Sequence, residues 1–397
     1  MVWSWWKRVA FRFGFALVVL FFYPFPLGYI PKTESIAEWL GKPFEWLVTW
    51  FGGSVLGVDV IAQQTGSGDT ALGWINMLVL VLLALIVAGI WTAVDRKRVA
   101  YPRLADLLWT LLRYALAMTM LVYGFSKCPP AQMPYPDYIM LDRHVGEMSP
   151  MGMLWTFMGS SPAYEVFSGL AEITGAVLLL WRRTATLGAL ILVGVLTNVV
   201  LLNFTYDVPV KLYSSQLLLI AIAIAAPQLR RVITVVLGGA AAEVPPRVRA
   251  SGRWERARLV TKIIVLLGFV PVYYLQIKGQ REYELPPSPI DGIYLVESYR
   301  GPDPKPWTRV AITARGMSVR HGDESRVRFQ FTDVPANGQV AITDDKATAL
   351  PPTTFTRPDL LRVTLDNKDL HVVLRRMGEP LLTSRGFNWV QELPFNR

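Results

Sequence analysis

The segment NVVLLNFTYDVPVKLYSSQLLLIAI, residues 198–222, decides the fold because a short polar insert separates two apolar runs. Each run extends into a stretch of about 20 predominantly apolar residues, the length of an α-helix that crosses the hydrocarbon core of a membrane. The insert NFTYDVPVK carries Asn203, Asp207 and Lys211. The segment therefore predicts two membrane helices joined by a polar turn at the membrane surface.

The whole chain has the composition of a membrane protein joined to a soluble domain. Of its 397 residues, 52% are hydrophobic and 18% are charged, and the mean hydropathy is +0.33. These values are too apolar for an ordinary soluble domain. The apolar residues fill positions 9–277, whereas the remainder reads as a soluble domain.

The apolar part divides into membrane spans of alternating direction. We predict seven spans, at roughly 10–30, 72–94, 106–125, 164–181, 185–204, 212–229 and 257–277. Lysine and arginine gather in alternate loops, including DRKR at 95–98 and seven arginines between Arg230 and Arg258. The positive-inside rule then predicts a multi-pass protein of the cell membrane, with a cytoplasmic N-terminus and a C-terminal domain on the outer, periplasmic or extracellular side. The first span is expected to be an uncleaved anchor.

The C-terminal domain has the pattern of a β-protein. After the proline-rich ELPPSP at 284–289, short alternating runs such as WTRVAITA and DLHVVLRRM are separated by Gly, Asp, Asn and Pro. This pattern predicts an antiparallel sheet or small barrel. LRVTLDNKDLHVVL predicts a hairpin that turns at 366–369, and the aromatic tail GFNWVQELPFNR is expected to close the sheet or dock on the membrane.

The expected fold is thus a membrane α-helical bundle followed by a β-domain. Its predicted parts are two N-terminal spans with an outer loop (1–105), a four-helix core (106–230), a basic inner loop with the seventh span (231–284) and the outer soluble β-domain (285–397).

Composition also excludes several classes of function. The net charge of +10 could suggest a nucleic-acid partner, but residues 278–397 carry 17 basic and 15 acidic side chains, so the excess charge belongs to the membrane part. Cys128 is the only cysteine, which excludes an intramolecular disulfide. The three histidines lie far apart in sequence, and we expect neither a metal site nor a nucleic-acid partner.

Ionisable side chains inside a membrane are costly and are therefore candidates for function. Arg113, Glu172 and Asn198 lie within predicted spans, and Glu172 and Asn198 share a depth of about 10–12 Å at 1.5 Å per residue. The outer rim adds further polar groups. We therefore expect an outward-facing polar pocket built from Arg113, Lys127, Glu165, Glu172, Asn198, Asn203, Asp207 and Lys211. No residue is assigned a catalytic role.

Local rules predict some contacts of these residues. Asp207 is expected to cap the sixth span, and Lys211 is expected to need Asp207 or Glu165 as an acidic partner. Small residues at Gly169, Gly175, Gly188 and Gly194 indicate close helix packing. Glu172 either lines a site for a substrate, proton or quinone, or pairs with Arg113 or Asn198 to lock the bundle. Residues 149–165 are expected to form an interfacial or re-entrant helix over the mouth of the pocket.

The motifs of residues 106–230 resemble a known family. They are Arg113 followed by YGFSK (123–127), GLAEITG (169–175) and two further short spans joined by a polar turn. This region resembles the DoxX-like integral membrane proteins. The resemblance implies a four-helix bundle and a membrane subunit linked to redox work. One branch is associated with thiosulfate:quinone oxidoreduction, and others with oxidoreductase complexes or with trafficking and assembly. The chain departs from this family by its two N-terminal spans, its seventh span and its β-domain.

Three functions remain open from the sequence. The first is a quinone- or lipid-binding accessory subunit of a membrane oxidoreductase. Its partners would be the lipid bilayer around it and a bound hydrophobic small molecule such as quinone. The chain has no signature of haem, flavin or iron–sulfur ligation, so its own catalysis is uncertain. The second is a non-enzymatic envelope assembly protein whose β-domain recruits a protein partner. The third is a small-molecule transporter.

Overall fold

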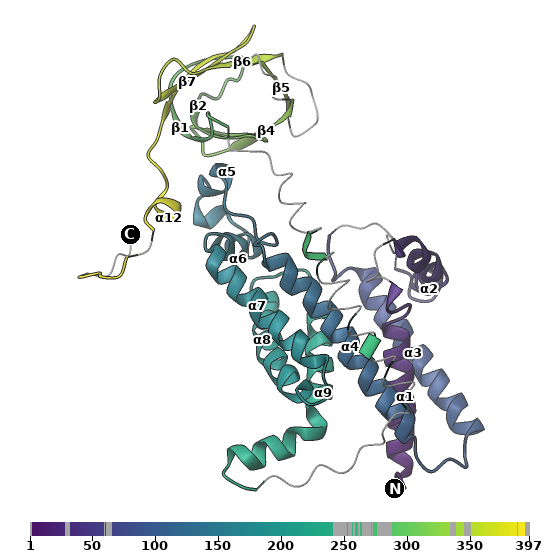
Figure 1. The fold of residues 1–397 in the computed structure, drawn as a ribbon. Helices are drawn as coiled ribbons and strands as arrows, with labels where there is room; N and C mark the ends of the chain where they lie inside the picture. Colours follow the sequence, from purple (N-terminus) through teal and green to yellow (C-terminus); the bar gives the residue numbers. More distant parts are fainter. Residues whose placement is uncertain are drawn as a thin grey trace. The chain divides into compact units, whose positions relative to one another are not determined.

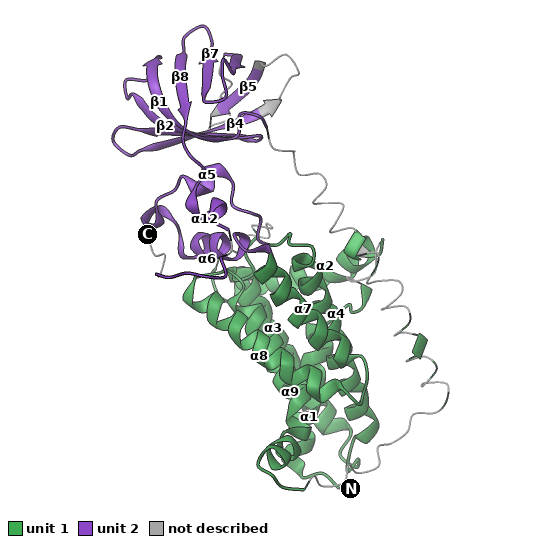
Figure 2. Ribbon diagram, turned by 60° about the vertical axis from the view of Figure 1, so that its left-hand side comes forward, with its two compact units in different colours: residues 1–132, 163–278 green, residues 133–162, 279–397 purple. Residues whose placement is uncertain are grey.

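A computed structural model describes residues 2–27, 32–58, 60, 66–240, 252, 256, 259–260, 263, 271, 273–275, 288–333, 339–344, 351–386 and 388–393. The chain forms two compact units. The helical unit contains residues 1–132 and 163–278, and the barrel unit contains residues 133–162 and 279–397. Figure 2 colours the two units separately. Residues 133–162, which we had assigned to the membrane core, thus form a compact unit with the β-domain.

The helical unit contains seven principal helices in the part of the chain that the structure describes. They are α1 (Trp5–Phe21), α2 (Glu34–Ser54), α3 (Ala71–Val94), α4 (Pro102–Lys127), α7 (Pro162–Leu179), α8 (Ala185–Thr205) and α9 (Lys211–Val236) (Figure 1). Within the described residues, α3, α4, α8 and α9 are long and apolar enough to cross a membrane. The predicted helical region is therefore confirmed, with four candidate membrane spans, and the count of seven spans stays a prediction. The predicted span 257–277 lies largely outside the described residues.

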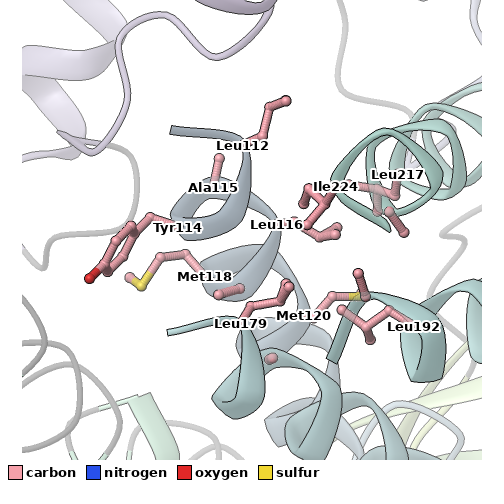
Figure 3. Packing of buried hydrophobic residues seen from close by; sticks show 14 of the residues in the cluster. Leu112, Tyr114, Ala115, Leu116, Met118, Met120, Leu179, Leu192, Leu217 and Ile224 are labelled. Atoms are coloured by element: carbon pink, nitrogen blue, oxygen red, sulfur yellow. The ribbon is translucent and has the colours of Figure 1, made fainter. Parts of the chain in front are cut away.

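Helix α4 lies at the centre of the helical core. Its residues 112–121 are all buried, and apolar side chains from α7, α8 and α9 pack against them. Figure 3 shows Leu116 and Met120 of α4 facing Ile224 of α9 and Leu192 of α8. Among the four membrane-length helices α4 has the lowest mean hydropathy, and its enclosure keeps its polar side chains Arg113 and Lys127 inside the bundle.

Two glycine pairs let α7 approach its neighbours closely. A Cβ on Gly169 would lie 2.8 Å from the Gly124 carbonyl oxygen of α4, and a Cβ on Gly188 would lie 2.6 Å from the Gly175 carbonyl oxygen. Small residues at such crossings bring helix backbones together. The predicted packing role of Gly169, Gly175 and Gly188 is confirmed. Gly194 differs, because a Cβ there would meet nothing within 4 Å.

Helix α2 was not predicted, since its segment fell in the expected outer loop 31–71. Val48 of α2 packs on Ile75 and Val79 of α3. Its opposite side exposes tryptophans, including Trp46 and Trp50, whose rings stack 6.4 Å apart. One apolar edge, charged residues and exposed indoles are typical of a helix that lies in a membrane interface.

The barrel unit contains a closed antiparallel barrel of eight strands with the order β1 to β8. The strands are β1 (Gly292–Arg300), β2 (Trp307–Thr313), β3 (Gly316–His321), β4 (Arg326–Asp333), β5 (Gln339–Asp344), β6 (Thr353–Thr356), β7 (Arg362–Asp366) and β8 (His371–Arg376) (Figure 1). The prediction of a small antiparallel barrel is confirmed, as is the β7–β8 hairpin, where Asp366 pairs with His371. Closure removes the exposed sheet edges that promote aggregation.

One of the two roles expected for the aromatic tail was wrong, while its docking on the membrane stays a prediction, and two strands were not predicted. Strand β8 closes the barrel by pairing with β1, so the aromatic tail does not close it. Strands β3 and β6 were missed because β6 has four residues and β3 carries charges beside apolar groups. All six residues of β3 are buried, although a half-exposed strand would alternate. The reason is the segment 133–162, whose polar groups bind the outward-facing side chains of β2 to β4.

The segment 133–162 forms α5 (Tyr138–Leu141), the short η2 (Val145–Glu147) and α6 (Pro150–Gly159). Ser149 caps α6 by accepting a hydrogen bond from the Gly152 amide at 3.0 Å, and Pro150 opens it. The predicted helix over 149–165 is confirmed for 150–159, and its place at a membrane interface stays a prediction. Helix α7 then begins at Pro162.

Candidate functional site

The predicted polar residues of the helical unit contain one buried ion pair. The Lys127 ammonium lies 2.8 Å from the Glu172 carboxylate, and both side chains are almost fully buried. The Lys127 ammonium also donates to the Tyr123 carbonyl oxygen at 3.4 Å. Lys127 ends α4 and Glu172 lies in the middle of α7, so the Gly124–Gly169 crossing brings the two charges together.

Glu165 lies close to this pair but binds a different group. Its carboxylate accepts a hydrogen bond from the Gln132 amide at 3.1 Å, and the side chain is fully buried. The Cys128 thiol donates to the Val166 carbonyl oxygen at 3.4 Å. Glu165 therefore holds the chain that leaves α4, because its carboxylate binds the backbone there.

Arg113 does not bind Glu172. Its guanidinium donates to the Leu179 carbonyl oxygen, with the Nε atom at 2.8 Å, and its carbon lies 4.6 Å from the centre of the Trp109 ring. Leu179 is the last residue of α7, and a cation is stabilising at the C-terminal end of a helix. Arg113 thus joins α4 to the end of α7.

Asn198 and Asn203 lie on different sides of α8. Asn198 is exposed, so the expected pairing with Glu172 is not seen. Asn203 is buried and donates from its amide to the Ser214 hydroxyl of α9 at 3.0 Å. Asn203 therefore contributes to the contact between α8 and α9.

The cap of α9 comes from a distant part of the chain. The Asp69 carboxylate accepts hydrogen bonds from the amides of Lys211 and Leu212 at 2.8 and 2.9 Å. The prediction that Asp207 caps this helix was wrong: Asp207 adopts a left-handed conformation with φ 52°. Of the two acidic partners expected for Lys211, Asp207 is the one observed, at a distance of 2.7 Å.

Most of the predicted polar residues therefore bind partners inside the helical unit. Empty volume lies elsewhere in that unit, in two adjoining cavities among α1, α2, α3 and α9. Five residues line both cavities: Phe21, Tyr23, Gly73, Asn76 and Leu80. Because the walls are shared, a molecule with two chemically different ends could occupy both.

The first, which we call the aromatic cavity, has a volume of about 370 Å³ and is further lined by Phe22, Pro24, Phe25, Gly68, Met77, Leu212, Tyr213 and Gln216. Its aromatic wall follows from the sequence FFYPFP at 21–26. Prolines 24 and 26 prevent α1 from continuing as a regular helix, and the aromatic side chains gather at its end. Phe21 stacks on Tyr213 of α9 at 6.5 Å between ring centres.

The second, which we call the charged cavity, has a volume of about 630 Å³ and is further lined by Leu20, Glu38, Gly41, Lys42, Phe44, Glu45, Val48, Thr70 and Leu72. Helix α2 supplies its three charged groups. Sequence reasoning missed both cavities, although FFYPFP and the run EWLGKPFEWLVTW at 38–50 were available as signals.

The barrel unit holds a second set of buried charges, centred on Asp142. The Asp142 carboxylate lies 3.1 Å from Arg309, 3.7 Å from Arg326 and 3.9 Å from Arg320. Asp142 and Arg320 are buried, with 2% and 3% of their side chains exposed. Burial raises the pKa of the Asp142 carboxyl, and the hydrogen bond and charge of Arg309 offset only part of that effect.

Two glutamates complete this cluster at the surface. Arg320 binds Glu147 at 2.9 Å and also binds Glu324. His144, Glu147 and Glu324 have ligand atoms close enough together for a metal ion. The Arg320 guanidinium is already the cation bound by both glutamates, so the donor set does not fit a metal. The cluster instead attaches residues 142–147 to the barrel wall.

The interior of the barrel is packed with apolar side chains, including Tyr294, Trp307 and Leu374. Trp307 is buried, whereas Arg309 is partly exposed and binds Asp142, and an irregularity in strand pairing separates the two residues. Residues two apart on a regular strand would share a face, and the bulge changes this alternation.

Comparisons with known proteins give one relative without a known function. No family model matches the chain, and no solved structure matches it significantly. The chain is 35% identical over 119 residues to the uncharacterized protein YwoB of Bacillus subtilis (strain 168), a match that covers 28% of this chain and 70% of YwoB. Identity at this level over most of the smaller protein shows that the chain belongs to the same family as YwoB.

Proposed function

We propose that this protein binds a membrane amphiphile, such as a lipid or an isoprenoid quinone, in the paired aromatic and charged cavities. The observation that carries the proposal is the shared wall of these cavities, which joins an aromatic space to a space lined by charges. Their volumes fall within the range of ordinary small-molecule sites. A molecule with a polar head and an apolar tail matches both environments.

The predicted topology supports this proposal. With a cytoplasmic N-terminus, the end of α1 and the beginnings of α3 and α9 would lie on the outer side of the membrane. The opposite end of these helices carries cations. At the beginning of α1 and just after α3, Arg12 donates to the Asp95 carbonyl oxygen and Arg8 donates to the Arg98 carbonyl oxygen. The cavities would then open toward the outer leaflet, and α2 would lie along its interface.

The buried polar residues that we first assigned to a pocket are proposed to stabilise the bundle. Lys127 and Glu172 neutralise each other in a buried ion pair, and Arg113 binds the C-terminal end of α7. The resemblance to DoxX-like proteins keeps a role beside a membrane oxidoreductase as part of the proposal, with quinone as one class of amphiphile. This role would make the protein an accessory subunit.

Mass spectrometry of small molecules retained by gently purified protein tests the proposal. Asn76 lines both cavities, so Asn76→Phe fills their junction. Leu78 lies two residues further along α3 and is 42% exposed, so Leu78→Phe is the matched control. Wild type and Leu78→Phe should retain a defined amphiphile that Asn76→Phe loses. Equal retention of bulk lipid by all three proteins would refute the proposal.

A second candidate, a protein-recruiting envelope module, is favoured by one observation in the barrel unit. Leu360 and Leu361 lie in the connection between β6 and β7 and are 77% and 62% exposed. Exposed apolar patches mark interaction sites. If the module recruits a partner, Leu360→Ser with Leu361→Ser should abolish a specific crosslink that wild type forms in intact membranes. A crosslink that survives the double change would exclude this surface.

A further inference from the structure

The charged residues of the charged cavity form one row on α2. Glu38, Lys42 and Glu45 are spaced by four and three residues, which places them on the same face of a helix. All three line the cavity, as does Val48 one turn further along. The row therefore presents the charge order negative, positive, negative to whatever fills the space.

The side chains of these three residues have no charged or hydrogen-bonding partner among the described residues. In the part of the chain that the structure describes, no ion pair or hydrogen bond joins the side chains of Glu38, Lys42 and Glu45 to each other or to another residue. The contrast with Lys211 is informative, because that lysine has two acidic partners. The row on α2 is thus available to a ligand.

The rest of the cavity suits the apolar part of an amphiphile. Tyr23 and Phe44 lie 5.4 Å apart between ring centres and form an aromatic wall. Asn76 and Leu80 continue this wall into the aromatic cavity. A ligand whose head lies against α2 would therefore direct its apolar part toward α1 and α9.

From this arrangement we infer that the ligand is a zwitterionic phospholipid, an inference that rests on the proposed function. Its phosphate would bind the Lys42 ammonium, and its ammonium group would bind the Glu38 or Glu45 carboxylate. Hydrogen bonds between such charged groups are stronger than neutral ones. An anionic phospholipid satisfies Lys42 but meets two carboxylates, and an uncharged quinone head leaves all three charges without partners.

The test is native mass spectrometry of delipidated, full-length protein in detergent, with phosphatidylethanolamine and phosphatidylglycerol added in equal amounts and with identical acyl chains. Wild type should retain phosphatidylethanolamine about tenfold better, which corresponds to about 1.4 kcal/mol. Lys42→Gln should lower its retention about tenfold, whereas Glu38→Gln with Glu45→Gln should bring retention of the two lipids to parity. Lys32→Gln is the matched control, because Lys32 precedes α2 and does not line either cavity.

The outcomes separate the inference from the proposed function. If wild type retains phosphatidylglycerol as well as phosphatidylethanolamine, or if Lys42→Gln has no effect, the zwitterionic ligand is excluded while amphiphile binding stands. If wild type retains neither lipid, and an isoprenoid quinone added in their place is not retained either, the proposed function fails as well. A loss in Lys32→Gln equal to that in Lys42→Gln would show a nonspecific charge effect and overturn the inference.

Discussion

The helical unit and the barrel unit both bury charged side chains, but they balance them differently. In the helical unit Lys127 and Glu172 form a single pair whose side chains are 7% and 3% exposed. In the barrel unit Asp142 and Arg320 are equally buried, yet their partners Glu147 and Arg309 are 34% and 31% exposed. A charge buried among apolar helices is cut off from water and needs a partner of opposite sign, whereas a cluster at a barrel surface can share its charge with solvent.

This difference predicts that the helical unit tolerates the loss of one charged partner less well than the barrel unit does. Removing one partner of a buried pair leaves an uncompensated charge, and replacing both by apolar groups is often neutral. In a cluster with exposed members, the remaining groups and water compensate part of the loss. The following changes test this contrast, from the largest expected effect to the smallest.

Glu172→Gln should lower the free energy of unfolding by about 3–5 kcal/mol, because it leaves the Lys127 ammonium buried without a counter-charge. The double variant Lys127→Met with Glu172→Leu should recover most of that loss. Denaturation in detergent, followed by circular dichroism, measures both. A double variant no more stable than Glu172→Gln would show that the pair contributes more than charge balance.

Gly188→Ala should lower the free energy of unfolding by about 1–3 kcal/mol, because the new methyl group would lie 2.6 Å from the Gly175 carbonyl oxygen. Gly194→Ala on the same helix is the matched control, since a Cβ there meets nothing within 4 Å. The control should be neutral or slightly stabilising, as alanine favours helix over glycine. Equal effects of the two changes on the detergent melting temperature would contradict the close crossing of α7 and α8.

Asp142→Asn should cost about 2 kcal/mol, the scale of hydrogen bonds to charged groups, and less than Glu172→Gln. The loss should be local, because Asp142 attaches its own segment to the barrel wall. Hydrogen exchange should quicken at residues 138–147 and along β3, while Asp369→Asn at the exposed β7–β8 turn leaves exchange unchanged. Unaltered exchange in Asp142→Asn would remove the cluster from the attachment of this segment.

The smallest expected effect is a pH dependence of the Asp142 contribution. Since burial raises its pKa above 3.8, the folded protein binds more protons than the unfolded chain between that value and the raised pKa. The stability advantage of wild type over Asp142→Asn should therefore grow as the pH falls from 7 toward 4. Paired denaturation curves measure it, and an advantage that shrinks with falling pH would mean that the arginines outweigh burial.

The sequence predicted the positions of helices and strands better than it predicted which charged side chains bind each other. Hydropathy located the helical segments, and the alternation in DLLRVTLD and DLHVVLRRM located the β7–β8 hairpin. Helix α2 was missed because its charges at Glu38, Lys42 and Glu45 made the segment resemble a loop. The charge partners were assigned less well, because depth in the membrane does not fix the rotation of a helix about its axis.

Three pairs of polar groups illustrate this difference. Lys211 and Asp207 are four residues apart, and this local pair was one of the two that the sequence predicted. Asp69 binds the beginning of α9 from 142 residues away, and no local rule could identify it. Glu172 binds Lys127 rather than Arg113 because Gly124 and Gly169 bring those faces of α4 and α7 together.

The amino-acid sequence by itself determined that this protein has an apolar helical region and a separate β-domain, because hydrophobic periodicity is a local property of the chain. Only the tertiary structure decided which polar groups bind each other and where cavities remain. Those outcomes depend on which helix faces meet, and that choice is made by packing among residues far apart in sequence. The cavities beside α2 and the Asp142 cluster on the barrel both arise in this way.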